Sequence, residues 1–270
     1  MSTKFDSPAL VDIGANLGHS SFRHDLDQVV NDARAAGVVH IIVTGTDLES
    51  TRTALSIVDG FGDYMSLTAG FHPHVASQLN DAALAEIASL ARHPKVVALG
   101  EMGLDFNRDF SPRDKQLQAF EQQLELATRI AKPVFLHQRD AHDSFMSLLK
   151  QYRPQLRAGV VHCFTDERKA LFDYLDLDMH IGITGWICDE RRGRHLQELV
   201  SEVPAERLLL ETDAPYLLPR SLQPPPAQRR NEPRFLPEVL RTVATCTGKP
   251  PAQVAAESTR AAADLFGLEV

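Results

Sequence analysis

The chain has 270 residues, of which 43% are hydrophobic and 24% are charged, so it is neither disordered nor fibrous. Its net charge of −8 excludes a protein that holds duplex DNA by overall positive charge, although a local basic patch remains compatible with the composition. The polar N-terminus predicts no signal peptide, and no apolar run is long enough to span a membrane. Three scattered cysteines suit a reducing compartment, so we expect a cytoplasmic protein.

Short apolar segments alternate with longer segments of helical periodicity along the chain. The apolar segments are typical of parallel strands that are buried on both faces. These predicted strands are residues 10–13, 38–44, 64–70, 96–100, 133–136, 159–161, 179–183 and 207–210. Helical periodicity is clearest at 81–91 and 113–130 and weaker at 47–58, 140–152, 167–175 and 192–200.

Eight strands that alternate with helices over this length predict an α/β fold, a single (β/α)₈ barrel of the TIM type spanning residues 1–270. The alternative is an open, doubly wound sheet, which normally begins with a glycine-rich turn. Residues 12–18 contain two glycines without the GxGxxG spacing, which favours the barrel. The proline-rich segment 214–237 predicts a functional loop after the last strand, with helices at 236–247 and 251–266 behind it.

Polar side chains that can bind metals follow several predicted strands directly. Glu101, His137 and His162 each come right after a strand, and Asp213 lies three residues after the last one. Because all strands of a parallel barrel end at the same face, we expect these four side chains to converge there. Two imidazoles and two carboxylates form a ligand set for a divalent cation, which can activate a bound water.

Four segments that contain these residues resemble the signature segments of the TatD family of metal-dependent deoxyribonucleases. They read GEMGLD from residue 100, HQRD from 137, HCFT from 162 and ETDAPY from 211. Similar stretches at 12–17, 70–74, 182–193 and 229–233 extend the resemblance over nearly the whole chain, toward the TatD branch of the family. The resemblance implies an amidohydrolase-like barrel acting as a 3′-to-5′ exonuclease on single-stranded DNA and RNA, in DNA repair or degradation.

The resemblance also implies roles for single residues. Glu101, His137 and His162 match the metal ligands of the family. Asp213 matches an aspartate that contacts the metal and its water, and we expect it to accept a proton from that water. His72 is expected to stabilise negative charge on the substrate phosphate.

Many family members bind a second metal through two histidines on the first strand, where this chain has Gly14 and Asn16. We therefore expect one tightly bound metal, and we expect histidines at both positions to create a second site. Two histidine ligands favour Zn²⁺ or Mn²⁺, whereas the resemblance implies Mg²⁺. We expect Mg²⁺ to support activity, with Zn²⁺ or Mn²⁺ as alternatives in the purified protein.

Several basic residues are candidates for contact with a single-stranded substrate. Arg139, two residues after His137, fits either a phosphate contact or a salt bridge. Arg229 and Arg230 lie in the segment 220–234, which holds four arginines against one glutamate and fits either a funnel for a strand or a solvated loop. The other candidates for substrate contact are Asn16, His74, Trp186 and Tyr216.

Two further functions compete with nuclease activity. The first is an amidohydrolase-type enzyme that cleaves C–N or ester bonds, many of which bridge two metals with a carboxylated lysine. No lysine follows a predicted strand here, and Glu101 stands at the equivalent place. The second is a barrel that binds nucleic acid without cutting it, against which the full ligand set argues. The sequence predicts no obligate protein partner, and we expect a monomer.

Overall fold

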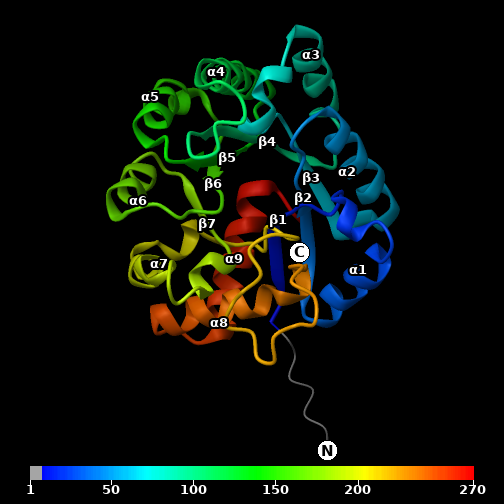
Figure 1. The fold of residues 1–270 in the computed structure, drawn as a ribbon, viewed down its shortest axis with the longest axis vertical. Helices are drawn as coiled ribbons and strands as arrows, with labels where there is room; N and C mark the ends of the chain where they lie inside the picture. The colour runs from blue at the N-terminus through cyan, green and yellow to red at the C-terminus, as the bar shows by residue number, and fades with distance from the viewer. Residues whose placement is uncertain (1–7) are drawn as a thin grey trace, which may run out of the picture.

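Eight parallel strands form one sheet in chain order in the computed structural model, which describes residues 8–270 (Figure 1). Residues 1–7, which make up most of the N-terminal segment considered for a signal peptide, lie outside the described residues. All eight predicted strands are present, and the first, fourth and fifth run further than predicted. They are β1 (Leu10–Ala15), β2 (Val38–Val43), β3 (Met65–Ala69), β4 (Val96–Asp105), β5 (Val134–Arg139), β6 (Gly159–Val161), β7 (His180–Ile183) and β8 (Leu208–Leu210).

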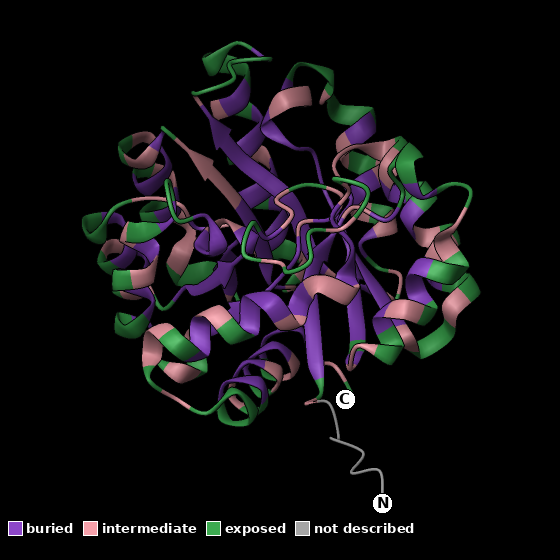
Figure 2. Cartoon of the chain, turned by 60° about the horizontal axis from the view of Figure 1, so that its bottom comes forward, coloured by how far each residue is buried: buried purple, intermediate pink, exposed green. Residues whose placement is uncertain are grey.

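Helices follow the strands and surround the sheet, with their outer faces exposed and the strands buried (Figures 1 and 2). They are α1 (Leu26–Ala35), α2 (Leu48–Phe61), α3 (Asp81–Leu90), α4 (Arg113–Ile130), α5 (His142–Tyr152), α6 (Arg168–Leu175), α7 (Arg194–Leu199), α8 (Leu236–Thr247) and α9 (Pro251–Phe266). The first helix was not among those predicted. Within residues 8–270, none of the helices combines the length and apolarity that crossing a bilayer requires.

The sheet closes into a barrel where β1 meets the segment after β8, which confirms the barrel over the open sheet. The backbone N–H of Asp213 donates to the carbonyl of Gly14 at 2.8 Å, and Ala15 forms a parallel bridge with Ala214. Both carboxylate oxygens of Asp12 are used at this seam, because they accept from the backbone N–H and the hydroxyl of Thr212 at 2.9 and 2.6 Å.

One end of the barrel is filled and the other is open to loops. Inward-facing residues of the strands, such as Val11, Ile13 and Phe135, form one apolar cluster with Leu265 and Phe266 of α9. This helix therefore covers the N-terminal ends of the strands. The C-terminal ends carry the polar side chains, as expected for a barrel of this class.

The proline-rich segment is a long connection between β8 and α8, as predicted, and it contains no α-helix or strand. Its two ends are held together by Asn231, whose backbone N–H donates to the carbonyl of Pro215 at 3.0 Å. The Asn231 side chain also donates to the carbonyl of Thr212 at 2.8 Å. The segment is thus fixed at its base beside the strand ends.

Candidate metal centre

Glu101 in β4 lies at the open end of the barrel, where three imidazoles surround one of its oxygens. Its Oε1 is 2.7 Å from Nε2 of His162, 2.9 Å from Nδ1 of His137 and 3.2 Å from Nε2 of His72. Burial alone would raise the pKa of Glu101, but His72 and His162 beside it and the hydrogen bond from His137 hold its pKa well below the ordinary value. The group is a buried carboxylate among nitrogen donors, which suits a divalent cation.

Adjacent elements bring these side chains together. β4 and β5 pair so that Gly103 is opposite His137, and the backbone N–H of His162 donates to the carbonyl of Leu136 at 2.9 Å. His72 comes from the loop after β3, and its backbone N–H donates to the carbonyl of Thr46 at 2.9 Å. The predicted convergence of Glu101, His137 and His162 is thus what the barrel produces.

Among residues 8–270, one group of potential ligands places its donor atoms within 4.8 Å of one another, namely His72, Glu101 and His137. This group includes His72 and omits His162, although His162 has the imidazole nitrogen nearest to Oε1 of Glu101. Distance alone therefore does not decide between the two histidines. The hydrogen bonds on the far side of each ring favour His162 over His72, because a ligating imidazole must present a free lone pair.

His162 is held from behind by a carboxylate. Its Nδ1 lies 3.3 Å from Oε2 of Glu211, which is fully buried and accepts from the backbone N–H of Cys163 through its other oxygen. In a neutral His162 ring the remaining proton therefore belongs on Nδ1, and Nε2 is left free for a cation. Burial would lower the pKa of His162, but Glu101 and Glu211 raise it well above the ordinary value, so a cation must displace a proton from this ring.

His137 has a similar arrangement with a second carboxylate. Its Nδ1 faces Glu101, whereas its Nε2 is buried without a hydrogen-bond partner among the described residues. The Oδ2 atom of Asp105 lies 3.6 Å from this Nε2 and already accepts from His74 at 2.7 Å. Because a buried N–H requires an acceptor, a small movement of the ring would give Nε2 this carboxylate and leave Nδ1 for a cation.

In His72 the two ring nitrogens have the opposite roles, because the one that carries the proton faces Glu101. Its Nδ1 accepts a hydrogen bond from the backbone N–H of His74 at 3.1 Å, so the proton of the neutral ring sits on Nε2, which faces Glu101. Burial lowers the pKa of His72 to about 4, despite the neighbouring Glu101, and keeps the ring neutral. These hydrogen bonds favour a role for His72 as a hydrogen-bond donor over a role as a ligand.

Asp213 lies near enough to Glu101 and His162 for their charges to affect its pKa, but it lies outside the close group of donor atoms. The side chain of Asn16 donates to its Oδ1 at 3.0 Å, which fixes the carboxyl group. Burial raises the pKa of Asp213 to about 8; His162 opposes this shift, and Glu101 and Glu211 add to it. A cation at Glu101 would favour the charged form of Asp213.

The prediction missed Asp105 and Glu211, the two carboxylates behind the histidines. Both lie in segments that resemble the family. Glu211 directly follows the last predicted strand, so the rule of polar residues at strand ends could have found it, whereas Asp105 lies five residues beyond the predicted end of the fourth strand. His74 and Asn16 donate to Asp105 and Asp213, and their predicted contact with substrate stays a prediction.

The space beside β1 is occupied by Glu211. A Cβ atom at Gly14 would lie 2.6 Å from its Oε2, and one at Gly182 would lie 2.5 Å from its Oε1. A histidine at position 14 could therefore enter only if Glu211 moved. Because this oxygen is the end of a flexible side chain, the expected second site from histidines at positions 14 and 16 requires a new position for Glu211 and stays a prediction.

The arginines of the segment 220–234 are mostly neutralised. Arg230 is 14% exposed, and its Nη2 lies 2.6 Å from Asp25 and 2.8 Å from Glu232. This pairing argues against the predicted contact of Arg230 with substrate. Arg220 and Arg234 also lie near carboxylates, those of Asp189 and Asp32.

Two of the predicted phosphate-binding arginines have no such partner. Arg229 is exposed and Arg139 is partly buried, and neither forms an ion pair within residues 8–270. The two residues predicted to stack on bases differ in how far their rings are free to contact a substrate. Arg192 lies 4.5 Å above the Trp186 ring and covers one face, whereas Tyr216 is half exposed beside His19.

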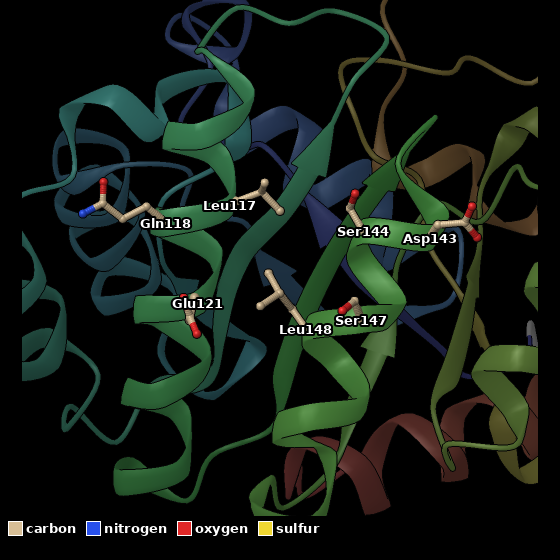
Figure 3. Close-up of a pocket in the computed structure, with 7 residues that line it drawn as sticks. All are labelled: Leu117, Gln118, Glu121, Asp143, Ser144, Ser147 and Leu148. Atoms are coloured by element: carbon tan, nitrogen blue, oxygen red, sulfur yellow. The ribbon is translucent and has the colours of Figure 1, made fainter.

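A shallow hollow on the outside of the barrel, between α4 and α5, does not compete with this site (Figure 3). Leu117 and Leu148 point into the space between the two helices. The lining contains two carboxylates, no histidine and no cysteine, so it offers no comparable set of donors. It consists of Leu117, Gln118, Glu121, Asp143, Ser144, Ser147 and Leu148.

Comparisons with known proteins agree with the resemblance seen in the sequence. The family model described as TatD related DNase matches residues 11–267. A 3'-5' ssDNA/RNA exonuclease TatD from Klebsiella pneumoniae (strain 342) is 51% identical over 97% of this chain and 99% of its own length.

Two solved structures show the same fold. A hydrolase TatD family protein from Entamoeba histolytica matches with a TM-score of 0.89 and 25% identity, over 97% of this chain and 99% of that one. YJJV, a TatD homologue from Escherichia coli k12, matches with a TM-score of 0.86 and 29% identity, over 96% of this chain and 98% of that one.

Proposed function

The chain belongs to the family of TatD-related DNases, and from this premise we propose that it is a divalent-metal-dependent exonuclease that hydrolyses single-stranded DNA and RNA from the 3′ end. The observation that carries the proposal is the buried Glu101 carboxylate, which two imidazoles approach at 2.7 and 2.9 Å from neighbouring strands. Each of these imidazoles has a carboxylate on its far side, which is how ligating histidines are oriented.

We propose Glu101, His137 and His162 as the ligands of the cation. When bound, the cation supplies a Lewis acid for the phosphate and lowers the pKa of a water. Mg²⁺ is proposed for activity, and Zn²⁺ or Mn²⁺ can replace it in the purified protein because nitrogen donors suit these ions better. The orphaned Nε2 of His137 and the carboxylates behind both rings support a site of this kind.

The other residues of the site act on water and phosphate. Asp213 accepts a proton from the attacking water, and Asn16 holds its carboxyl group in position through the hydrogen bond to Oδ1. His72 donates from Nε2 to a non-bridging phosphate oxygen, for which its neutral state suits it. Arg139 and Arg229 bind phosphates of the strand.

Oligonucleotides labelled at the 3′ or the 5′ end test this function. We expect single strands and frayed ends to be shortened from the 3′ end with Mg²⁺, faster than blunt duplexes, and not at all with a chelator. Turnover of an amide or ester panel without cleavage of oligonucleotides would favour an amidohydrolase instead. Binding without cleavage would favour the non-catalytic barrel.

One cation is expected to remain bound to each chain after dialysis. Gly14 offers no donor, and the oxygens of Asp12 are engaged by Thr212. Elemental analysis of the dialysed protein measures the stoichiometry, and Glu101→Gln is expected to retain no cation. Two equivalents retained by the unmodified chain would contradict the assignment of a single site.

Arg229 and Arg230 provide a matched pair of variants. Arg229→Ala is expected to weaken binding to a single strand and to reduce the salt dependence by about one phosphate contact, with an unchanged melting temperature. Arg230→Ala is expected to destabilise the fold by ~1–3 kcal/mol, because it leaves the buried Glu232 without this partner. Binding titrations at several salt concentrations and thermal melts separate the two effects, and the reverse pattern would show that Arg230 binds the strand.

In the cell we propose a cytoplasmic monomer that acts in the repair or degradation of DNA. The cysteines Cys163, Cys188 and Cys246 are free thiols, which suits a reducing compartment. Subcellular fractionation and size-exclusion chromatography test these two points.

A further inference from the structure

Phe110, in the loop between β4 and α4, is 67% exposed, more than any other large hydrophobic residue among residues 8–270. A phenylalanine ring has no polar group, so exposure gains it nothing from water. Because Phe110 lies beside the candidate metal centre, its exposed ring is a candidate for contact with the substrate. A second exposed aromatic residue, Tyr216, lies three residues after Asp213 in the loop that follows β8.

A series of ring-to-ring contacts connects Phe110 with the candidate metal centre. The Phe110 ring packs edge-on to His74 with centroids 4.7 Å apart, and His74 packs in the same way on His72 at 4.2 Å. His72 in turn lies 4.6 Å from the His137 ring. The exposed ring is therefore the outermost member of a series of edge-on ring contacts that ends at a proposed ligand.

Hydrogen bonds fix the backbone of the loop on both sides of Phe110. The hydroxyl of Ser111 donates to the carbonyl of His74 at 3.0 Å and accepts from the backbone N–H of Ser77 at 3.2 Å. On the other side, Oδ1 of Asp105 accepts from the backbone N–H of Arg108 at 2.9 Å. The backbone on both sides of the ring is thus hydrogen-bonded, so little ordering is needed for a flat partner to bind.

We propose that Phe110 is a substrate-binding residue that stacks on an unpaired base of the strand near the scissile phosphate. The proposal rests on the proposed nuclease function and adds a contact to a base, which the metal centre does not provide. Arg108 beside it is exposed and forms no ion pair among the described residues, so a cation for the backbone accompanies the ring. An aromatic face with a nearby cation suits single-stranded nucleic acid without regard to sequence.

Phe110→Ala is expected to raise KM for a single-stranded oligonucleotide about tenfold with little change in kcat, because stacking contributes to binding of the strand. The effect should vanish on an oligonucleotide whose last three nucleotides at the 3′ end are abasic. Phe110→Trp should retain the wild-type KM, whereas Phe110→Leu should behave like the alanine variant. Phe172→Ala, the same change at a partly exposed phenylalanine on α6, is the matched control and should have no effect.

A binding measurement keeps this test independent of catalysis. An oligonucleotide with 2-aminopurine at its 3′ end should lose fluorescence on binding to the unmodified protein, and less so with Phe110→Ala. If the unmodified protein quenches this probe but cuts no oligonucleotide, the nuclease function fails and the stacking contact stands. The proposal would be overturned if Phe110→Ala left both KM and the fluorescence quench unchanged, a result that would instead fit a contact with another protein. It would also be overturned if Phe110→Ala raised KM equally for the abasic strand.

Discussion

Replacing Glu101 by glutamine is expected to lower nuclease activity by at least ~100-fold while the fold remains intact. The substitution keeps the size of the side chain and removes the charge that a cation requires. The new amide would also present either an oxygen or an NH₂ group to two imidazoles that approach at 2.7 and 2.9 Å. The rate of cleavage of a labelled single strand at saturating Mg²⁺ measures the loss, and a thermal melt confirms the fold.

Three comparisons sharpen this result. His137→Ala and His162→Ala should lose activity to a similar extent, and a chelator should do the same to the unmodified protein. Glu238→Gln makes the same chemical change at a buried carboxylate of α8 outside the site, and it should keep wild-type turnover. Normal activity in Glu101→Gln with saturating metal would disprove the assignment of Glu101 as a ligand.

The strands of the barrel could be predicted because each is a short apolar run with polar residues at its end. The helix α1 was missed, although its sequence contains the same kind of signal as the predicted helices. Its apolar residues Leu26, Val29, Val30 and Ala33 recur at the three- and four-residue spacing of one helical face, and the last three are buried. The same logic of strand ends placed Glu101, His137 and His162 at one face before the fold was known. A local pattern is sufficient for such residues because the barrel aligns all strand ends.

Features that depend on pairs distant in the chain could not be predicted. Arg230 reaches Asp25, which lies 205 positions earlier, and only the fold shows that its charge is already used. The hydrogen bond behind the His72 ring likewise favours a donor over a ligand, and no sequence pattern contains that bond. Phe110 looks like a core residue by type, and its exposure follows from a loop that is tied to the neighbouring element.

Asp213 poses the remaining question about the site, because it was predicted both as a metal ligand and as the proton acceptor. Its carboxyl group lies outside the close group of donor atoms that includes Glu101 and His137, but so does His162, so this group does not separate the two roles. Its one side-chain hydrogen bond comes from Asn16, which positions it without neutralising it. We propose the role of proton acceptor, which the resemblance to the family implies, and one variant separates it from the role of a ligand on which metal binding depends.

Asp213→Asn is therefore expected to lower kcat by at least ~100-fold, the contribution typical of a general base, and to retain the bound cation. The asparagine keeps an oxygen that can accept from Asn16, so the loop should stay in place. Elemental analysis and oligonucleotide cleavage on the same preparation distinguish this variant from Glu101→Gln, which should lose both metal and activity. Asn16→Ala, which removes only the positioning bond, should have a smaller effect on kcat. Loss of the cation from Asp213→Asn would show that Asp213 is a ligand, and undiminished turnover would show that the proton goes to another group.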